Sequence, residues 1–555
     1  MRAMRSVLRR CGRVVVVILL AASAAAMAKW HPAGRCLAAE PPTAAAPATD
    51  EVLDPAALAH RIDRLLEAAW TAEQVEPSPP ADDAEFLRRV FLDLTGRIPS
   101  VAEVREFLDD RDPQKRGNQV EQLLQRATFP AHFGRMLRDL MLPGSVANPQ
   151  LQFLAPQFEA WLRLRLEDGA GYDRLVTDLL TYAGAATTVR GAALNAEPNP
   201  GAFYQVNERR PENLAASTSR LFLGVQLECA QCHNHPFAKW KREEFWAFAA
   251  FFNSIDTAGR GDLADQLARR ADPRGIRIPG TDTMVSPKLL DGTEPDWQPN
   301  ESMGATLARW MTSASNPYFA RATVNRVWWQ FFGRGLIDPV DDLDESNVAS
   351  QPDVLDELTR QFRAHRFDFK FLARAITSTR AYQLSSRTTH ASQDDPRHFA
   401  RMPLRSLTAE QLYDSLVQAT GFDGQFYFGR GEEIVRISTP RAAFLSKFSD
   451  TGPSRTDYQG SILQALTMMN GRLTADASTL QRGATLQAVS EAPFLSTADK
   501  IETLFLATLS RKPTRDELIT MELFVRFADT AESENATLAD VFWALLNSAE
   551  FVLNH

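Results

Sequence analysis

The sequence predicts a mainly α-helical protein with two helical lobes, joined by a loop-rich segment that has a few short strands. Over most of the chain, apolar residues recur at intervals of three and four, as they do on the buried face of a helix. At several points Ser or Thr is followed three residues later by Glu or Gln, the capping-box signature of a helix start. One stretch, residues 256–300, interrupts this pattern with many Gly, Pro and Asp residues and marks the connector between the lobes.

The first 39 residues differ from the rest of the chain. They contain seven basic and no acidic side chains, with an apolar run from Val14 to Ala28. These are the features of a signal peptide, or of an N-terminal anchor if the segment is retained. The run is short for a bilayer span of about 20 residues, so we expect an exported protein of the periplasm or cell surface. Residues 40–50, rich in Pro and Ala, predict a linker.

The first lobe, residues 51–255, is predicted to be helical. A capping box of Ser100 and Glu103 begins one helix. Residues 184–210, rich in Ala, Gly, Asn and Pro, predict a long loop. The spacing of apolar residues places the helices at residues 58–66, 86–94, 100–107, 119–125, 157–166, 172–180, 212–227 and 245–252.

The second lobe, residues 301–555, repeats this pattern after a predicted short strand at residues 276–278 in the connector. Its capping boxes are Thr408 with Gln411 and Thr514 with Glu517. Residues 433–438 predict an isolated strand. The helices are predicted at residues 303–311, 319–331, 354–365, 371–377, 409–420, 461–470, 498–509, 515–527 and 538–551.

The charge of the chain argues against nucleic-acid binding. The whole chain carries a net charge of −8 and the first 39 residues contribute +7, so residues 40–555 carry −15. Such a surface repels phosphates, and no cluster of basic and aromatic residues offsets it. We therefore expect no nucleic-acid partner, and no membrane span beyond the possible N-terminal anchor.

One motif points to a specific chemistry. Without the N-terminal segment the chain keeps two cysteines, in the sequence Cys229-Ala230-Gln231-Cys232-His233. In c-type cytochromes the two thiols of such a motif add to the vinyl groups of haem, and the histidine binds the iron. The sequence therefore predicts haem c attached at Cys229 and Cys232, with His233 as the proximal ligand.

Three alternatives stay open for this motif. Cys229 and Cys232 could bind zinc together with His233 or His235 and a fourth ligand. They could also form a structural or redox-active disulfide, or be the inert remnant of a haem site. Because His235 is too close in sequence to reach the opposite haem face easily, it could instead donate a hydrogen bond beside the site.

The sixth ligand of the iron is not specified by the sequence. Met284, Met303 and Met311 follow the motif and could complete a His/Met pair, but such residues are more typical of packing or loops. Asp342 and Asp344 lie in the most acidic stretch and loosely resemble a calcium loop. The glycine of that loop is replaced by Asn347, so a turn before a helix explains this stretch better.

The residues around the motif, from Arg220 to Phe237, resemble the planctomycete cytochrome C family, specifically its second cytochrome-type domain of unknown function. The segment Phe91–Gly96 followed by Pro99 carries the same resemblance. The second lobe resembles the family's planctomycete-specific C-terminal domain, also of unknown function. The segments that carry this second resemblance are 316–321, 324–328, 332–336, 338–342, 378–382, 464–466 and 547–551.

The chain departs from the family pattern at several positions. Asn234 replaces a common aspartate between the two histidines of the motif, and Gln351 replaces a histidine before Pro352. An aromatic and acidic segment usual near residues 136–146 is also changed. No second Cys-x-x-Cys-His is present, so the resemblance implies at most one haem.

These observations predict an exported haem-c-type redox or electron-transfer protein. The alternative is a non-redox scaffold or binding protein in which Cys229 and Cys232 hold zinc or a disulfide. In either case the partner would be a redox protein or a surface glycan. Because the chain has no nucleophile motif, glycine-rich phosphate loop or H-E-x-x-H sequence, no enzymatic reaction is predicted.

Overall fold

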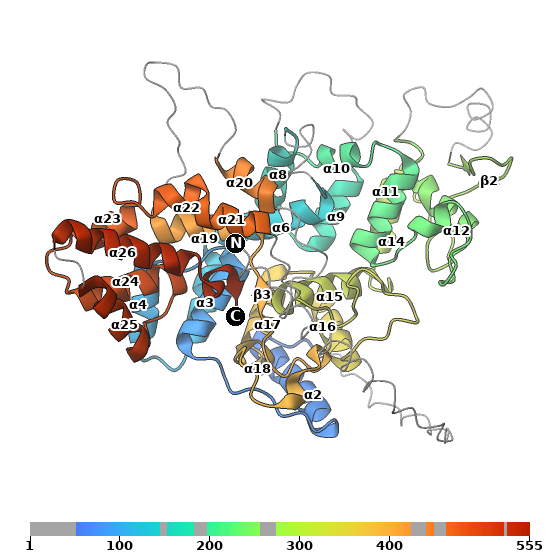
Figure 1. Ribbon diagram of the computed structural model, residues 1–555. Coiled ribbons are helices and arrows are strands. Elements are labelled where there is room, and N and C mark those ends of the chain that lie inside the picture. The colour runs from blue at the N-terminus through green and yellow to red at the C-terminus, as the bar shows by residue number, and fades with distance from the viewer. Residues whose placement is uncertain are drawn as a thin grey trace, which may run out of the picture. The chain divides into compact units, whose positions relative to one another are not determined.

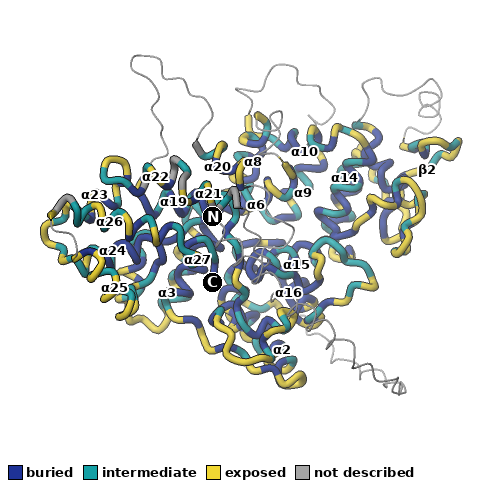
Figure 2. The backbone as a smooth tube through the Cα atoms, in the orientation of Figure 1, coloured by how far each residue is buried: buried dark blue, intermediate teal, exposed yellow. Residues whose placement is uncertain are grey.

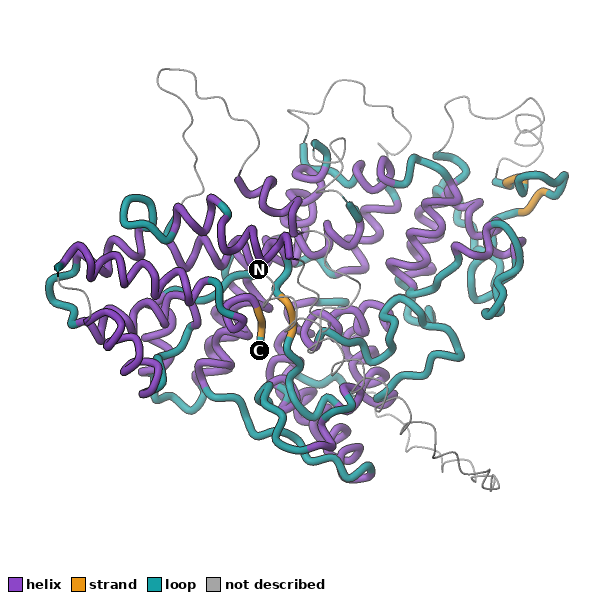
Figure 3. The backbone as a smooth tube through the Cα atoms, in the orientation of Figure 1, coloured by secondary structure: helices purple, strands orange, loops and turns teal. Residues whose placement is uncertain are grey.

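The computed structural model describes residues 51–144, 153–182, 197–255, 274–422, 440–448, 462–526 and 530–555. Within these ranges the chain is mainly helical, with two short two-stranded sheets (Figure 1, Figure 3). The predicted mainly α fold is confirmed. The predicted N-terminal signal segment and the predicted strand at residues 433–438 lie outside the described residues.

The helices of the N-terminal half follow the predicted order. The capping box is confirmed, because Glu103 N donates to Ser100 Oγ over 3.3 Å and Ser100 N donates to Glu103 Oε2 over 2.7 Å. The predicted loop at 184–210 is wrong in part, since it contains the short helix α10. The elements are α2 (Pro55–Ala72), α3 (Asp83–Thr95), α4 (Val101–Asp109), α5 (Lys115–Gln125), α6 (Thr128–Met141), α8 (Ala155–Glu167), α9 (Tyr172–Leu180), α10 (Gly201–Val206), α11 (Pro211–Thr218), η2 (Ser219–Leu223), η3 (Glu228–Gln231), α12 (Arg242–Ala249) and η4 (Ala250–Phe252).

A hairpin and a second series of helices follow. The predicted strand near residue 276 is confirmed as β1 (Ile276–Arg277), which pairs antiparallel with β2 (Met284–Val285). Both predicted capping boxes of this half are present. The elements that follow are α14 (Met303–Met311), α15 (Phe319–Phe332), α16 (Pro352–Ala364), α17 (Phe369–Ser378), α18 (Arg380–Gln383), η5 (Ala391–Gln393), η6 (Pro396–His398), β3 (Arg405–Ser406), α19 (Ala409–Thr420), α20 (Pro440–Phe448), α21 (Ile462–Asn470), α22 (Arg472–Ala477), α23 (Ala484–Glu491), α24 (Thr497–Leu509), α25 (Arg515–Arg526), α26 (Ala531–Leu546), α27 (Ala549–Val552) and β4 (Leu553–Asn554).

The buried residues, drawn in dark blue in Figure 2, form two apolar cores. One core takes its side chains from residues 58–402 together with Leu506, and the other from residues 407–551 together with Leu92 and Ile98. The connector contributes Ile278, Leu289 and Leu290 to the first core. Helices on both sides of the connector therefore share one core.

A buried ion pair lies where the two cores meet. Asp93 in α3 accepts hydrogen bonds from Arg405 Nη1 over 3.0 Å and Arg405 Nη2 over 2.9 Å. Tyr382 Oη and Asn554 Nδ2 each donate to the same carboxylate over 2.9 Å. All four side chains are fully buried or nearly so, and Asn554 belongs to β4, which pairs antiparallel with β3. The segment Phe91–Gly96 thus anchors the end of the chain.

No helix in the described part of the chain is long and apolar enough to cross a membrane.

Candidate functional site

The Cys-x-x-Cys-His motif begins where a helix is interrupted. The π-turn η2 ends at Gly224, whose φ of +65° is left-handed and closes the helix. A separate 3₁₀ turn, η3, begins one residue before the motif and contains Cys229, and Cys232 follows directly after it. The sequence predicted one helix up to residue 227, and the glycine is the physical reason why it stops earlier.

Both cysteines of the motif are accessible. Cys229 and Cys232 are exposed and carry free thiols. Ala230 between them is fully buried and fixes the turn to the first core. The motif therefore presents two thiols to the outside from a turn that is anchored by its middle residue.

The ring of His233 has a defined orientation. Its Nδ1 atom lies 2.8 Å from the carbonyl oxygen of Asn234. A carbonyl oxygen can only accept, so Nδ1 carries the proton and donates it. In the neutral ring the lone pair is then on Nε2. Metal-binding histidines commonly have this arrangement, in which one ring nitrogen donates to a carbonyl and the other binds the metal.

His235 has the opposite arrangement. Its Nδ1 accepts hydrogen bonds from the backbone N–H groups of Phe237, over 3.2 Å, and Ala238, over 2.8 Å. The proton of the neutral ring is therefore on Nε2, which leaves no lone pair for a metal ion. His235 N also donates to Trp240 O over 2.8 Å. This residue stabilises the loop after the motif, and the geometry favours His233 over His235 as a ligand.

Helix α12 forms hydrogen bonds to the motif. The carbonyl oxygen of Gln231 accepts from Trp246 Nε1 over 3.0 Å and from Arg242 Nε over 3.4 Å. Asn234 Oδ1 accepts from Arg242 N, the first backbone N–H of α12, over 3.0 Å. An aspartate could accept the same bond, so the departure at Asn234 keeps the bond and removes a charge.

The acidic stretch lies beside the motif, although about 100 residues separate them in the sequence. His235, Asp342 and Asp344 line one cavity of about 410 Å³. The loop is held there because Leu343 N donates to Gly224 O over 2.7 Å. A Cβ atom at position 224 would lie 2.5 Å from Leu343 Cδ1, so glycine permits this approach.

The two aspartates of this cavity differ in their pKa values. Partial burial, with Asp344 and Asp341 nearby, raises the pKa of Asp342. Hydrogen bonds from the backbone and hydroxyl of Ser346 lower the pKa of Asp344, whose Oδ1 accepts them over 3.0 and 2.8 Å. Asp344 thus closes a turn. Among the described residues no group of three or more His, Cys, Asp or Glu side chains could hold a metal ion.

The candidate sixth ligands have different surroundings. Met311 is fully buried in the first core, as expected for a packing residue. Met303 begins α14 and is half-buried. Met284 is half-buried in β2, in a hairpin that contacts α12. Arg242 of α12 joins this hairpin to the motif, because Arg242 Nη2 donates to Pro279 O over 2.6 Å.

One aromatic ring next to the motif is almost completely exposed. The Phe237 side chain has 94% of its surface accessible. Its neighbour Trp240 is buried, with Lys239 above its ring at 5.3 Å. An exposed phenyl ring beside two thiols and a histidine offers an apolar surface to a bound group.

Comparison with protein families gives two matches. Residues 61–257 match the family PSCyt2, a protein of unknown function (DUF1549), and residues 305–442 match PSD1, a protein of unknown function (DUF1553). Both matches lie in one chain, in this order. This is the pairing that the sequence motifs predict, and the name PSCyt2 hints at a cytochrome-related domain. No curated protein matches the chain, and no solved structure does.

The two matched regions meet at the candidate site. The Cys-x-x-Cys-His motif lies in the PSCyt2-like region and the acidic stretch lies in the PSD1-like region. The bond from Leu343 N to Gly224 O joins them, and so does the ion pair of Lys239 with Glu345. The cavity beside the motif is therefore built from both regions, which sequence reasoning did not foresee.

Proposed function

We propose that this chain is an exported redox protein that carries one covalently attached haem c and passes electrons to or from a partner. The observation that carries the proposal is the orientation of His233. Its Nδ1–H is bonded to Asn234 O, which leaves the lone pair on Nε2, and His233 directly follows Cys232, one of two exposed free thiols. Export is supported by the basic and apolar N-terminal segment.

The residues present fit the attachment of haem. Each thiol, on Cys229 and Cys232, would add its S–H across one vinyl C=C bond. A sulfur–carbon bond forms and the hydrogen goes to the other vinyl carbon, so no oxidant is needed. His233 Nε2 would bind the iron, and the exposed ring of Phe237 offers apolar cover. When bound, haem would supply one-electron exchange.

The experiment is expression of the full chain together with a c-type maturation system. The purified protein should keep a haem spectrum after denaturation, and its mass should exceed that of the bare chain by one haem. Cys229→Ser with Cys232→Ser should abolish this adduct. His233→Ala should keep the adduct but change the spectrum of the iron, whereas the matched control His235→Ala should leave that spectrum unchanged.

Two outcomes would contradict the proposal. Stoichiometric zinc in a colourless protein would favour a scaffold with a structural metal. A colourless, metal-free protein whose mass lacks two hydrogens would favour a scaffold with a Cys229–Cys232 disulfide. In either case, the cavity next to the motif would be tested as a binding site for a protein partner or a surface glycan.

A further inference from the structure

A second cavity, of about 290 Å³, lies between α6, α15, α17 and α19. It shares no lining residue with the cavity beside the motif. Helices α6, α15 and α17 belong to the first apolar core and α19 to the second. Its volume is close to the lower end of those of small-molecule sites, about 300–1,000 Å³.

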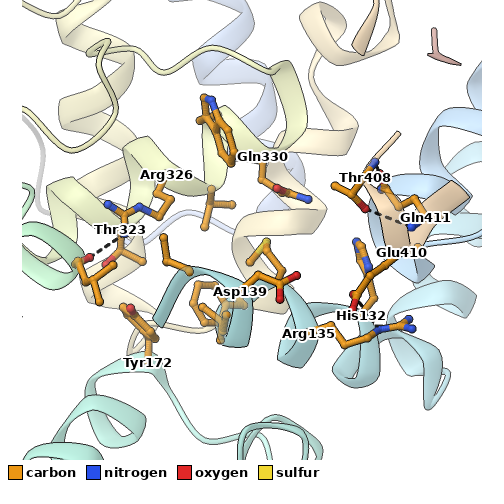
Figure 4. A pocket seen from close by; sticks show the side chains of 18 of the residues that line it. His132, Arg135, Asp139, Tyr172, Thr323, Arg326, Gln330, Thr408, Glu410 and Gln411 are labelled. Atoms are coloured by element: carbon orange, nitrogen blue, oxygen red, sulfur yellow. Dashed lines mark hydrogen bonds and ion pairs between the residues drawn. The ribbon is translucent and has the colours of Figure 1, made fainter. Parts of the chain in front are cut away.

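The cavity is lined by apolar side chains and by charged groups at two ends, with Arg135 and Glu410 at one end and Arg326 at the other (Figure 4). Leu140, Val327 and Phe369 contribute apolar walls. Asp139 projects from α6 into the cavity, and Glu410 approaches from α19 on the same side. An apolar chamber with a few convergent polar groups is the usual form of a small-molecule site.

The charged side belongs to a network with one more carboxylate than guanidinium groups. Its members are Arg135, Arg138 and Arg441, and Asp139, Glu159, Glu410 and Asp414. Glu410 contacts all three arginines, and Asp414 contacts Arg135 and Arg441. This network therefore carries a net charge of −1 when all its groups are ionised. Arg326, which donates to Leu221 O over 2.9 Å, lines the cavity away from this network and contributes one positive charge there.

Among the carboxylates of this network that line the cavity, Asp139 has the fewest ion pairs. In the described part of the chain its ion pair is with Arg138 alone, over 2.6 Å, and Arg138 also pairs with Glu159 and Glu410. The Asp139 side chain nevertheless has 48% of its surface accessible, and it lines the cavity. Burial raises the pKa of Asp139 to about 6, with Arg138 opposing and Glu410 adding to the shift.

We propose that this cavity binds a small organic cation, an amine or ammonium group on a compact apolar body. The cationic head would neutralise the Asp139 carboxylate, and the body would contact Phe369 and Val327. A cation here supplies the positive charge that the network lacks, and a charge-assisted hydrogen bond to a carboxylate is stronger than one between neutral groups. Trp329 also lines the cavity and offers a π-face for a cation.

The test is calorimetric titration of the full chain at pH 7.5 with benzylamine, cyclohexylmethylamine and benzyltrimethylammonium. Benzyl alcohol is the neutral control for the charge. At least one of the three cations should bind saturably and at least tenfold more tightly than the alcohol. Asp139→Asn should reduce that affinity to the level of the alcohol, whereas Asp109→Asn, a change of an exposed carboxylate at the end of α4, should not alter it.

A fold control accompanies these variants. Because the raised pKa of Asp139 costs stability above that pKa, the thermal midpoint of Asp139→Asn at pH 7.5 should not fall. Leu140→Trp, which fills the cavity from a half-buried position, should abolish binding of the cations. Equal affinity for cations and alcohol, binding insensitive to Asp139→Asn, or no saturable binding of any of the three cations would overturn the proposal.

The affinity should also depend on pH. Cation binding needs an ionised Asp139, so affinity should fall as pH decreases through about 6. The charged groups that act on Asp139 are Arg138 on α6, Glu159 on α8 and Glu410 on α19. The other titratable or charged side chains that line the cavity are His132, Arg135, Tyr172, Arg326 and Asp414. In Asp139→Asn this dependence on pH should be lost, because the carboxylate that titrates is absent.

Discussion

Removal of the Asp93 carboxylate tests how the two apolar cores are joined. In Asp93→Ala, the guanidinium of Arg405 stays fully buried without the two bonds of 3.0 and 2.9 Å that it makes to Asp93. Breaking a buried ion pair on one side costs about 3–5 kcal/mol, because an uncompensated charge remains in the interior. The hydroxyl of Tyr382 and the amide of Asn554 lose their acceptor as well. We expect a loss of about 3–5 kcal/mol in the free energy of unfolding.

Urea unfolding followed by circular dichroism measures this loss. The matched control is Asp356→Ala, because Asp356 forms an exposed pair with Arg321 and such pairs contribute about 0–1 kcal/mol. The double variant Asp93→Ala/Arg405→Met should lose less than the sum of its single variants, by about 0.5–3 kcal/mol. Equal losses in Asp93→Ala and Asp356→Ala, or strict additivity in the double variant, would refute the reasoning.

Two further predictions concern backbone and charge. Gly224→Ala should lose about 1–2 kcal/mol of stability from the left-handed backbone, with additional loss from the approach to Leu343. In urea titrations, the double variant Gly224→Ala/Leu343→Ala should recover the loss that comes from the contact with Leu343, but not the loss that comes from the left-handed backbone. Equal stability of Gly224→Ala and the native chain would contradict this prediction. Burial raises the pKa of Glu103, but hydrogen bonds from Arg97 and from the backbone of Ser100 outweigh this effect and lower the pKa to about 2. The stability that this carboxylate contributes is therefore present above pH 4.5 and lost as pH falls toward 2, and thermal melts of Glu103→Gln should lack that part of the acid dependence.

The sequence by itself predicted the features that depend on neighbours along the chain. Helix starts such as Ser100 and Thr408 were correct because a capping box involves residues only three apart. The mainly α fold was correct because the period of apolar residues is local. The pentapeptide beginning at Cys229 was visible for the same reason, since its ligand types and spacing are contiguous. The orientation of its histidine was not, because it depends on backbone geometry.

Tertiary structure alone decided which distant residues share an environment. Asp93 in α3 has no local sign of being buried, and its partners Arg405 and Asn554 lie 312 and 461 residues further along the chain. The cavity faced by Asp139 likewise exists only because α6 and α19 pack together. A polar residue in a helix is buried or exposed according to what packs on it, and that is set by the three-dimensional arrangement of the helices. The spacing of apolar residues along the sequence therefore determines where the helices form, and the packing of distant helices determines which sites lie between them.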